Sequence, residues 1–189
     1  MAVVVVLDAC VLHPAALRDF LMRLAIAGLI RARWSETIMD EWERSVLRVV
    51  EGVSPDALRR TRELMKKALP DADVTGLESL IDRIELPDAD DRHVVAAAMR
   101  GGAQAIATFN LKDFPAEKLA THGVEAQHPD DLVLDLVDVD PGAVLAVVRR
   151  QAAALKNPPM TVDEVLARLE EQGLVRSVAR LRELSGVTE

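Results

Sequence analysis

The residues best suited to chemistry are acidic side chains placed at the ends of apolar segments. Asp8 follows the apolar run Val3–Leu7 directly, and Asp91 begins a second apolar stretch. Glu41 lies within an amphipathic stretch, and Asp113 follows a third apolar segment. Carboxylate oxygens without histidine or cysteine partners favour Mg²⁺ or Mn²⁺ over zinc. The pattern therefore predicts a metal-dependent reaction if these segments converge.

Asp8 is expected at the carboxyl end of a central strand. Its five preceding residues are apolar and mostly β-branched, as in buried parallel strands. Open α/β sheets carry their sites at this end of the strands. The alternative is a turn or helix-cap residue, but the following Ala9–Leu12 is unusually apolar for a turn.

Glu41 is separated from its acidic neighbours by helix geometry. At about 100° per residue it lies about 60° from Ile38, at the edge of the expected buried face. A carboxylate there is costly unless it is paired or bound to metal. The alternative is a rim glutamate paired with Arg44 or Arg48. The buried face itself is predicted to hold Ile38, Trp42, Ser45 and Val49.

Asp91 is expected in the first turn of a helix, on its inward face. Negative charge is favourable at a helix N-terminus, so an ordinary capping aspartate is the alternative. Asp88 and Asp90 compete for the same role, because helix boundaries read from sequence shift by a few residues.

A fourth group follows the expected strand Gln104–Thr108. Asn110 and Asp113 could reach the same sheet edge, and the Thr108 hydroxyl could orient water or another ligand. A routine Asn/Asp loop is the alternative.

The set as a whole predicts more than its members do. Packed carboxylates repel one another and raise their pKa values, and a divalent ion relieves that repulsion. We therefore expect Asp8, Glu41, Asp91, Asp113 and Asn110 to hold one or two Mg²⁺ or Mn²⁺ ions. His13 and His93 are interpreted as helix-surface residues rather than ligands, and Cys10 as a small buried residue rather than a nucleophile.

The elements that position these residues alternate between strands and helices. This order predicts a three-layer α/β/α fold with a central, mostly parallel sheet. The expected strands are Val3–Leu7, Leu29–Trp34, Ile84–Leu86, Gln104–Thr108 and Val124–Gln127. The expected helices are Pro14–Ala27, Glu36–Val50, Ser54–Ala68, Thr75–Arg83, Asp91–Arg100 and Asp130–Val137.

Pro141 marks a possible boundary near the C-terminus. We expect the α/β domain to span residues 1–138 and a helical extension to span 139–189. The extension should contain a helix over Gly142–Leu155, a break at Asn157–Pro159 and two short helices, the first with a capping box from Thr161.

Composition limits the range of functions. The net charge of −8 argues against a large nucleic-acid footprint, and 3 % aromatic residues argue against base-stacking platforms. The densest basic stretch, Arg59–Lys67, is most simply a solvated helix face. A single cysteine excludes an internal disulfide and suits a reducing cytoplasm, and the N-terminal apolar run is too short for a signal peptide or membrane span.

Four segments together resemble the PIN-domain nucleases, in particular the VapC-like toxins of bacterial toxin–antitoxin pairs. They are VVVVLDACVL (3–12), WSETIMDE (34–41), DADDRHVVAAA (88–98) and ATFNLKDFP (107–115). The resemblance covers about residues 1–137. The tail around Asn157–Thr161 is similar to a C-terminal extension found in some VapC-like proteins.

The resemblance implies a metal-dependent ribonuclease in which Asp8, Glu41 and Asp91 bind the metal. The fourth acidic position differs, because Asn110 stands where many relatives have Asp, and Asp113 is the other candidate. The family also implies an RNA substrate, a small antitoxin partner and often a homodimer. An antitoxin with basic residues would complement a toxin of net charge −8.

Other functions are less well supported by the residues. An acid-cluster phosphatase would need a second Asp two residues after the first, where Cys10 stands. A PIN-fold protein that only binds RNA or a partner is another alternative, although its three main acids are intact. A PIN nuclease of RNA maturation, without an antitoxin, would carry the same acids.

Overall fold

A four-stranded parallel sheet organises the molecule, and the computed structural model describes residues 2–185 of the chain. The strands are β1 (Val3–Leu7), β2 (Ile30–Arg33), β3 (Ala105–Ala107) and β4 (Glu125–Gln127), in the order β2-β1-β3-β4. Val5 of β1 pairs with Ala32 of β2 on one side and with Ala105 of β3 on the other. The α/β fold class and the parallel sheet are thus confirmed.

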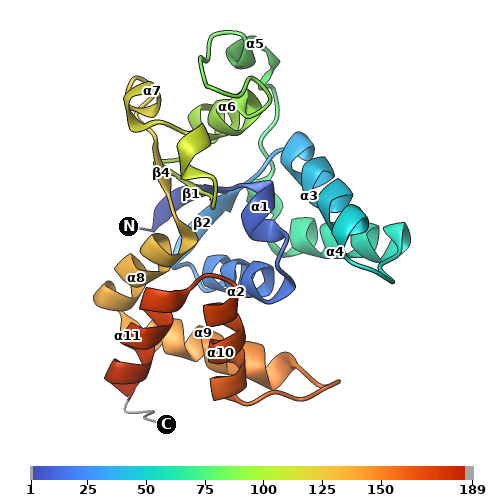
Figure 1. Ribbon diagram of the computed structural model, residues 1–189, viewed down its shortest axis with the longest axis vertical. Helices are drawn as coiled ribbons and strands as arrows, with labels where there is room; N and C mark the ends of the chain where they lie inside the picture. Colours follow the sequence, from blue (N-terminus) through green and yellow to red (C-terminus); the bar gives the residue numbers. More distant parts are fainter. Residues whose placement is uncertain (1, 186–189) are drawn as a thin grey trace.

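Helices cover both faces of this sheet (Figure 1). Helix α6 (Arg92–Gly101) packs on β1, β2 and β3, and α2 (Ala15–Ile26) packs on β2 from the opposite side. Every residue from His93 to Ala98 is buried, so α6 is covered on nearly every side. The short helix α1 (Ala9–Leu12) connects β1 to α2 and packs on α3 (Glu36–Val49).

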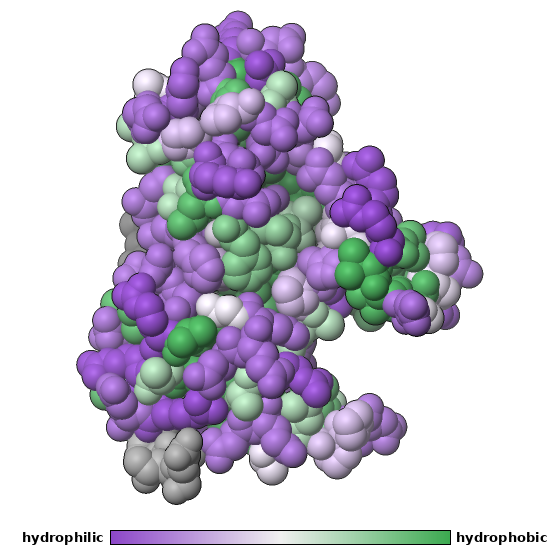
Figure 2. Space-filling model, viewed as in Figure 1, coloured by the Kyte–Doolittle hydropathy of each residue, from purple (hydrophilic) through white to green (hydrophobic). Residues whose placement is uncertain are grey.

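Helices α3 and α4 (Pro55–Ala68) form an arm that stands out from the sheet in Figure 1. Ser35 caps α3 by accepting the Ile38 N–H, as expected for an N-cap serine. Figure 2 shows an apolar patch over this arm, where the exposed large side chains are Leu47, Val49, Val50 and Leu64. Val49, expected on the buried face of α3, is 62 % exposed, and Val46 is buried in its place.

One expected strand is wrong. Residues Ile84–Leu86 form a loop, although Ile84 is buried. Pro87 follows directly and lacks the N–H that a sheet ladder needs. Neighbouring connections are the short helices α5 (Glu78–Ile81), η1 (Pro70–Ala72), η2 (Leu111–Asp113) and α7 (Ala116–Ala120).

The C-terminal helices pack against the α2 side of the sheet. They are α8 (Pro129–Val139), α9 (Pro141–Ala154), α10 (Val162–Glu171) and α11 (Val175–Ser185). The amide of Gln151 donates to the Ala16 carbonyl, and the Leu17 N–H donates to Gln172. The capping box at Thr161 is confirmed, whereas the division at residue 138 stays a prediction.

Buried polar groups also join these helices to one another. Asp130, at the start of α8, accepts the backbone N–H groups of Arg176 and Ser177 at 2.8 and 2.9 Å. The Ser177 hydroxyl donates to the same carboxylate. No helix among residues 2–185 is long and apolar enough to cross a membrane.

Candidate metal-binding active site

A cavity of about 410 Å³ lies where β1 ends and α3 and α6 meet. Each of the three principal acids predicted from the sequence reaches it from a different element: Asp8 after β1, Glu41 within α3 and Asp91 before α6. Asn110, from the loop after β3, lines the same space. The full lining is Asp8, Ala9, Cys10, Glu41, Arg44, Ser45, Arg48, Asp91 and Asn110.

Asp8 is buried and held by three donors. Its Oδ1 accepts the Ala9 N–H at 2.7 Å, so it does cap α1. Its Oδ2 accepts the Thr108 hydroxyl at 2.7 Å and the Cys10 thiol at 3.1 Å. The alternative of a helix cap is therefore correct for Asp8, whose carboxylate is fixed in orientation at the sheet edge, and its role as a site residue stays a prediction.

Cys10 serves as a hydrogen-bonding neighbour of Asp8. Burial, followed by the Asp8 charge, raises the pKa of the thiol to about 12. The thiol therefore keeps its proton at neutral pH, and its sulfur accepts the Phe109 N–H at 3.3 Å. The protonated thiol donates to Asp8, and the interpretation of Cys10 as a residue without a nucleophilic role stays a prediction.

Glu41 pairs with His93, and this contact was missed from the sequence. Glu41 Oε1 lies 2.9 Å from His93 Nε2. His93, interpreted as a surface residue, is instead 7 % exposed, and its Nδ1 has no partner among the described residues. The sequence signal for the burial of His93 was the run of residues that follows Asp91. This run is apolar on every face of the helix, which is typical of a buried helix. Neither Arg44 nor Arg48 pairs with Glu41.

Asp91 carries the clearest electrostatic signature. Burial first, and then the charges of Asp8, Asp88 and Asp113, raise the pKa of Asp91 to about 6. These carboxylates are thus close enough to repel. Asp88 and Asp90, the competing candidates, are exposed, and Asp88 accepts the Asp90 N–H in a local turn.

The loop after β3 places the remaining candidates. Thr108 is fully buried, donates to Asp8, and accepts the Asn110 N–H at 3.0 Å. Asn110 lines the cavity, whereas Asp113 lies outside the lining and acts on Asp91 through its charge. Asn110 is therefore better placed than Asp113 to reach a group in the cavity.

The donor chemistry fits a hard divalent cation, although the ligand shell is not closed. The acids provide oxygens, and their repulsion is what a divalent ion would relieve. Within residues 2–185, no three His, Cys, Asp or Glu side chains form a group that could hold an ion as they stand. Glu41 is engaged by His93, and Asp8 by Thr108 and Cys10.

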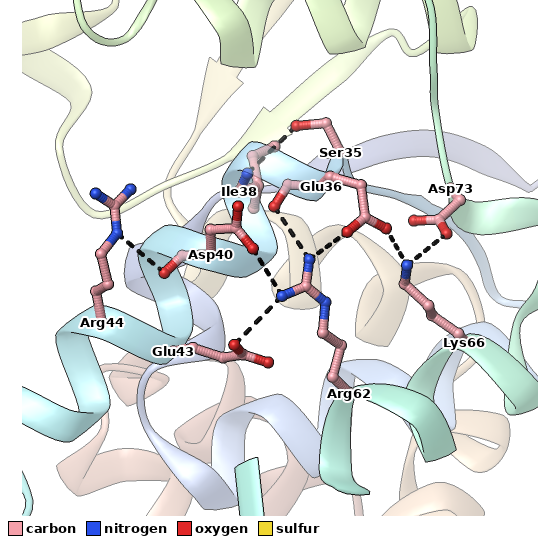
Figure 3. Close-up of polar contacts among 9 residues, drawn as sticks. All are labelled: Ser35, Glu36, Ile38, Asp40, Glu43, Arg44, Arg62, Lys66 and Asp73. Carbon is pink, nitrogen blue, oxygen red and sulfur yellow. Dashed lines mark hydrogen bonds and ion pairs between the residues drawn. The ribbon is translucent and has the colours of Figure 1, made fainter. Parts of the chain in front are cut away.

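The acids on the other side of α3 are neutralised by α4 (Figure 3). Arg62 contacts Glu36, Asp40 at 2.7 Å and Glu43 at 3.3 Å. Lys66 contacts Glu36 and, at 3.1 Å, Asp73. Arg62 and Lys66 of the stretch Arg59–Lys67 therefore join α4 to α3, which corrects the interpretation of a solvated face for these two cations, whereas Arg59, Arg60 and Lys67 are exposed.

Comparisons with known proteins agree with this architecture. Residues 4–112 match the family model of the PIN domain, and residues 129–183 match that of the VapC50 C-terminal domain. Over 82 residues the chain is 44 % identical to "Putative ribonuclease VapC50" of Mycobacterium tuberculosis (strain ATCC 25618 / H37Rv), covering 43 % of this chain and 48 % of that protein. The chain thus matches about half the length of this curated relative. No solved structure gives a significant match.

The matched residues contain the strand, helix and loop segments that build the cavity. The PIN match spans more than half of the chain and includes Asp8, Glu41, Asp91 and Asn110. The match to a VapC50 C-terminal domain falls on helices α8 to α11. The chain therefore belongs to the PIN-domain family and carries a VapC50-type C-terminal region.

Proposed function

We propose that this chain is a metal-dependent endoribonuclease that hydrolyses RNA phosphodiester bonds. The observation that carries the proposal is the meeting of Asp8, Glu41 and Asp91 around one cavity of a PIN domain. Burial first, and then the charges of Asp8, Asp88 and Asp113, raise the pKa of Asp91. Acids that served only stability would be paired with cations, as they are between α3 and α4. The name of the matched relative supports the same activity.

In the proposed reaction Asp8, Glu41 and Asp91 hold one or two Mg²⁺ or Mn²⁺ ions. When bound, such an ion acidifies the attacking water and stabilises the charge that develops on the phosphate oxygens. Thr108 keeps Asp8 in place through its 2.7 Å hydrogen bond, and His93 sets the position of Glu41. The Asn110 amide, at the cavity wall, orients water or a phosphate oxygen. Asp113 contributes charge from outside the lining.

We further propose that the protein is the toxin of a VapBC-type pair in the cytoplasm, held inactive by a small antitoxin, and that it forms a homodimer. Two findings support a partner of this class: residues 129–183 match the VapC50 C-terminal domain, and 82 residues of the chain are 44 % identical to a VapC50 protein. The exposed patch of Leu47, Val49, Val50 and Leu64 is apolar surface of the kind that partners cover.

Cleavage of RNA with and without Mg²⁺ or Mn²⁺ tests the activity. The native protein should cleave only with metal, whereas folded Asp8→Asn and Asp91→Asn variants should lose cleavage. Asp40→Asn is the matched control, because Asp40 lies on α3 but contacts Arg62 outside the cavity. Absent cleavage by the native protein would favour a PIN-fold binding protein instead, and cleavage without metal would contradict the metal-dependent mechanism.

Association with the antitoxin is tested separately by its salt dependence. If basic antitoxin residues approach the acidic cavity, the affinity should fall as salt rises. An association unaffected by salt would contradict this contact. A nuclease that cleaves RNA but has no antitoxin partner would instead be one of RNA maturation.

A further inference from the structure

The cavity that holds the acids also holds two arginines. Arg44 and Arg48 lie on the same side of α3 as Glu41, three and seven residues further along, and all three line the cavity. Helix geometry places residues at these spacings on one face. Helix α3 therefore runs along the cavity wall from an expected metal ligand to two guanidinium groups.

These guanidinium groups make few contacts with the rest of the fold. Arg44 donates only its Nε–H, to the Asp40 backbone carbonyl at 3.3 Å (Figure 3). Arg48 makes no hydrogen bond or ion pair with any residue of the described part of the chain. By contrast, Arg62 on α4 contacts three carboxylates. Arg44 and Arg48 thus keep their charge available to a ligand in the cavity.

A polyanion needs such cations here. The chain carries a net charge of −8, and the acids of the cavity repel one another. An RNA strand that approached only these groups would be repelled. Guanidinium groups bind phosphate oxygens through paired N–H donors, so two of them beside the acids offset the repulsion where the strand must enter.

The spacing of the two arginines fits a single strand. Residues four apart on an α-helix are separated by about 6 Å along its axis, which is close to the separation of neighbouring phosphates in one RNA strand. We infer that Arg44 and Arg48 bind successive backbone phosphates of single-stranded RNA on one side of the bond to be cleaved. This inference rests on the proposed ribonuclease function and adds the site that holds its substrate.

Contacts of this kind are made to the backbone and not to the bases. The nine residues of the cavity lining include no aromatic side chain on which a base could stack. Two phosphate contacts therefore contribute affinity without selecting a sequence. Selection of a cleavage site would have to come from other contacts along the strand.

Salt titration of RNA binding tests the inference without cleavage. The parent protein is the Asp8→Asn variant, and the probe is a short fluorescent single-stranded RNA. For single strands, log K falls with log salt by about 0.7 per phosphate neutralised. Arg44→Gln and Arg48→Gln should each reduce this slope by about 0.7, and the double variant by about 1.4. Arg44→Lys and Arg48→Lys, which keep the charge, should restore most of it.

Arg59→Gln is the matched control, because Arg59 is exposed on α4 and pairs only with Asp56. Unchanged slopes in the Arg44 and Arg48 variants, with the parent still binding RNA, would overturn the inference and leave the ribonuclease proposal intact. Loss of antitoxin binding in those variants, with normal RNA slopes, would assign the arginines to the partner instead and also overturn it. A parent that binds no RNA would contradict the proposed function itself.

Discussion

Helix α3 carries acids on two sides. The acids on one side are paired with a cation, whereas the acid on the other side faces a cavity with other acids. On one side Glu36, Asp40 and Glu43 meet Arg62, whose side chain is 13 % exposed. On the other side Glu41 faces a cavity shared with Asp8 and Asp91, and no lysine or arginine among residues 2–185 pairs with it. Glu41 and the three acids that meet Arg62 all lie on the same fourteen-residue helix.

The difference separates acids that hold the fold together from acids that weaken it. Ion pairs between α3 and α4 fix the arm and lower the pKa of Glu36, chiefly through the hydrogen bond from Lys66. In the cavity, burial and like charges raise the pKa of Asp91. Clustered acids that oppose folding are retained where they perform chemistry, and the perturbed pKa points to that function.

The largest difference between the two sides should be in activity. Glu41→Gln removes a proposed metal ligand, and RNA cleavage should fall by at least about a hundredfold, since a bound ion contributes several kcal/mol to the transition state. Asp40→Asn changes the neighbouring residue on the other side and should stay within about twofold of the native rate. Initial rates with saturating Mn²⁺ measure both. Equal losses in the two variants would show that α3 matters only as a scaffold.

Bound metal should stabilise the folded protein through the cavity acids and not through the ion pairs between α3 and α4. At a hundred times its dissociation constant, Mn²⁺ should raise the free energy of unfolding by about 2.7 kcal/mol. Asp91→Asn should remove most of this gain, whereas Asp40→Asn should keep it. Urea unfolding with Mn²⁺ and with chelator gives the two values. A gain of the same size in Asp91→Asn would place the ion elsewhere.

How far these two sides were predictable from sequence follows from the range of the interactions. Glu41 was separated from Asp40 by helix periodicity, and Ser35 marked the start of α3, because both signals are local. Asp8 was found because a charge directly after a buried strand is unusual. The alternation of strand and helix segments then sufficed to predict the fold class.

Contacts between distant segments were not predictable in this way. The partner of Glu41 is His93, 52 residues further along the chain, and the partners of Arg62 lie on a different helix. Ile84 is buried in a loop, so its apolar character predicted burial correctly and a strand wrongly. Which charges meet depends on how helices dock, and periodicity within one helix carries no information on that.

The free energy of unfolding should depend more on Arg62, which pairs with the acids of α3, than on an exposed arginine of α4. Arg62→Ala leaves the three acids without their central partner, and we expect a loss of about 2 kcal/mol in the free energy of unfolding. Arg59→Ala, which breaks only the exposed pair with Asp56, should change it by less than about 0.5 kcal/mol. Chemical denaturation of both variants is the measurement. Similar small effects would mean that the α3–α4 ion pairs do not stabilise the arm.

The smallest effect should be the pH dependence caused by Asp91 in metal-free protein. Its pKa is 3.8 ordinarily and about 6 in the folded protein. Between these values the unfolded chain has ionised Asp91 while the folded protein still binds the proton, so stability falls as pH rises through this window.

Asp91→Asn cannot ionise and avoids the loss. The variant should therefore gain on the native protein from about pH 4 to pH 6, by on the order of 1 kcal/mol because the carboxylate is partly solvated, and the gain should level off above. Thermal unfolding in chelator across this range measures the difference. A difference independent of pH would show that burial and the neighbouring carboxylates do not raise the pKa of Asp91, and the contrast between the two sides of α3 would then lose its electrostatic basis.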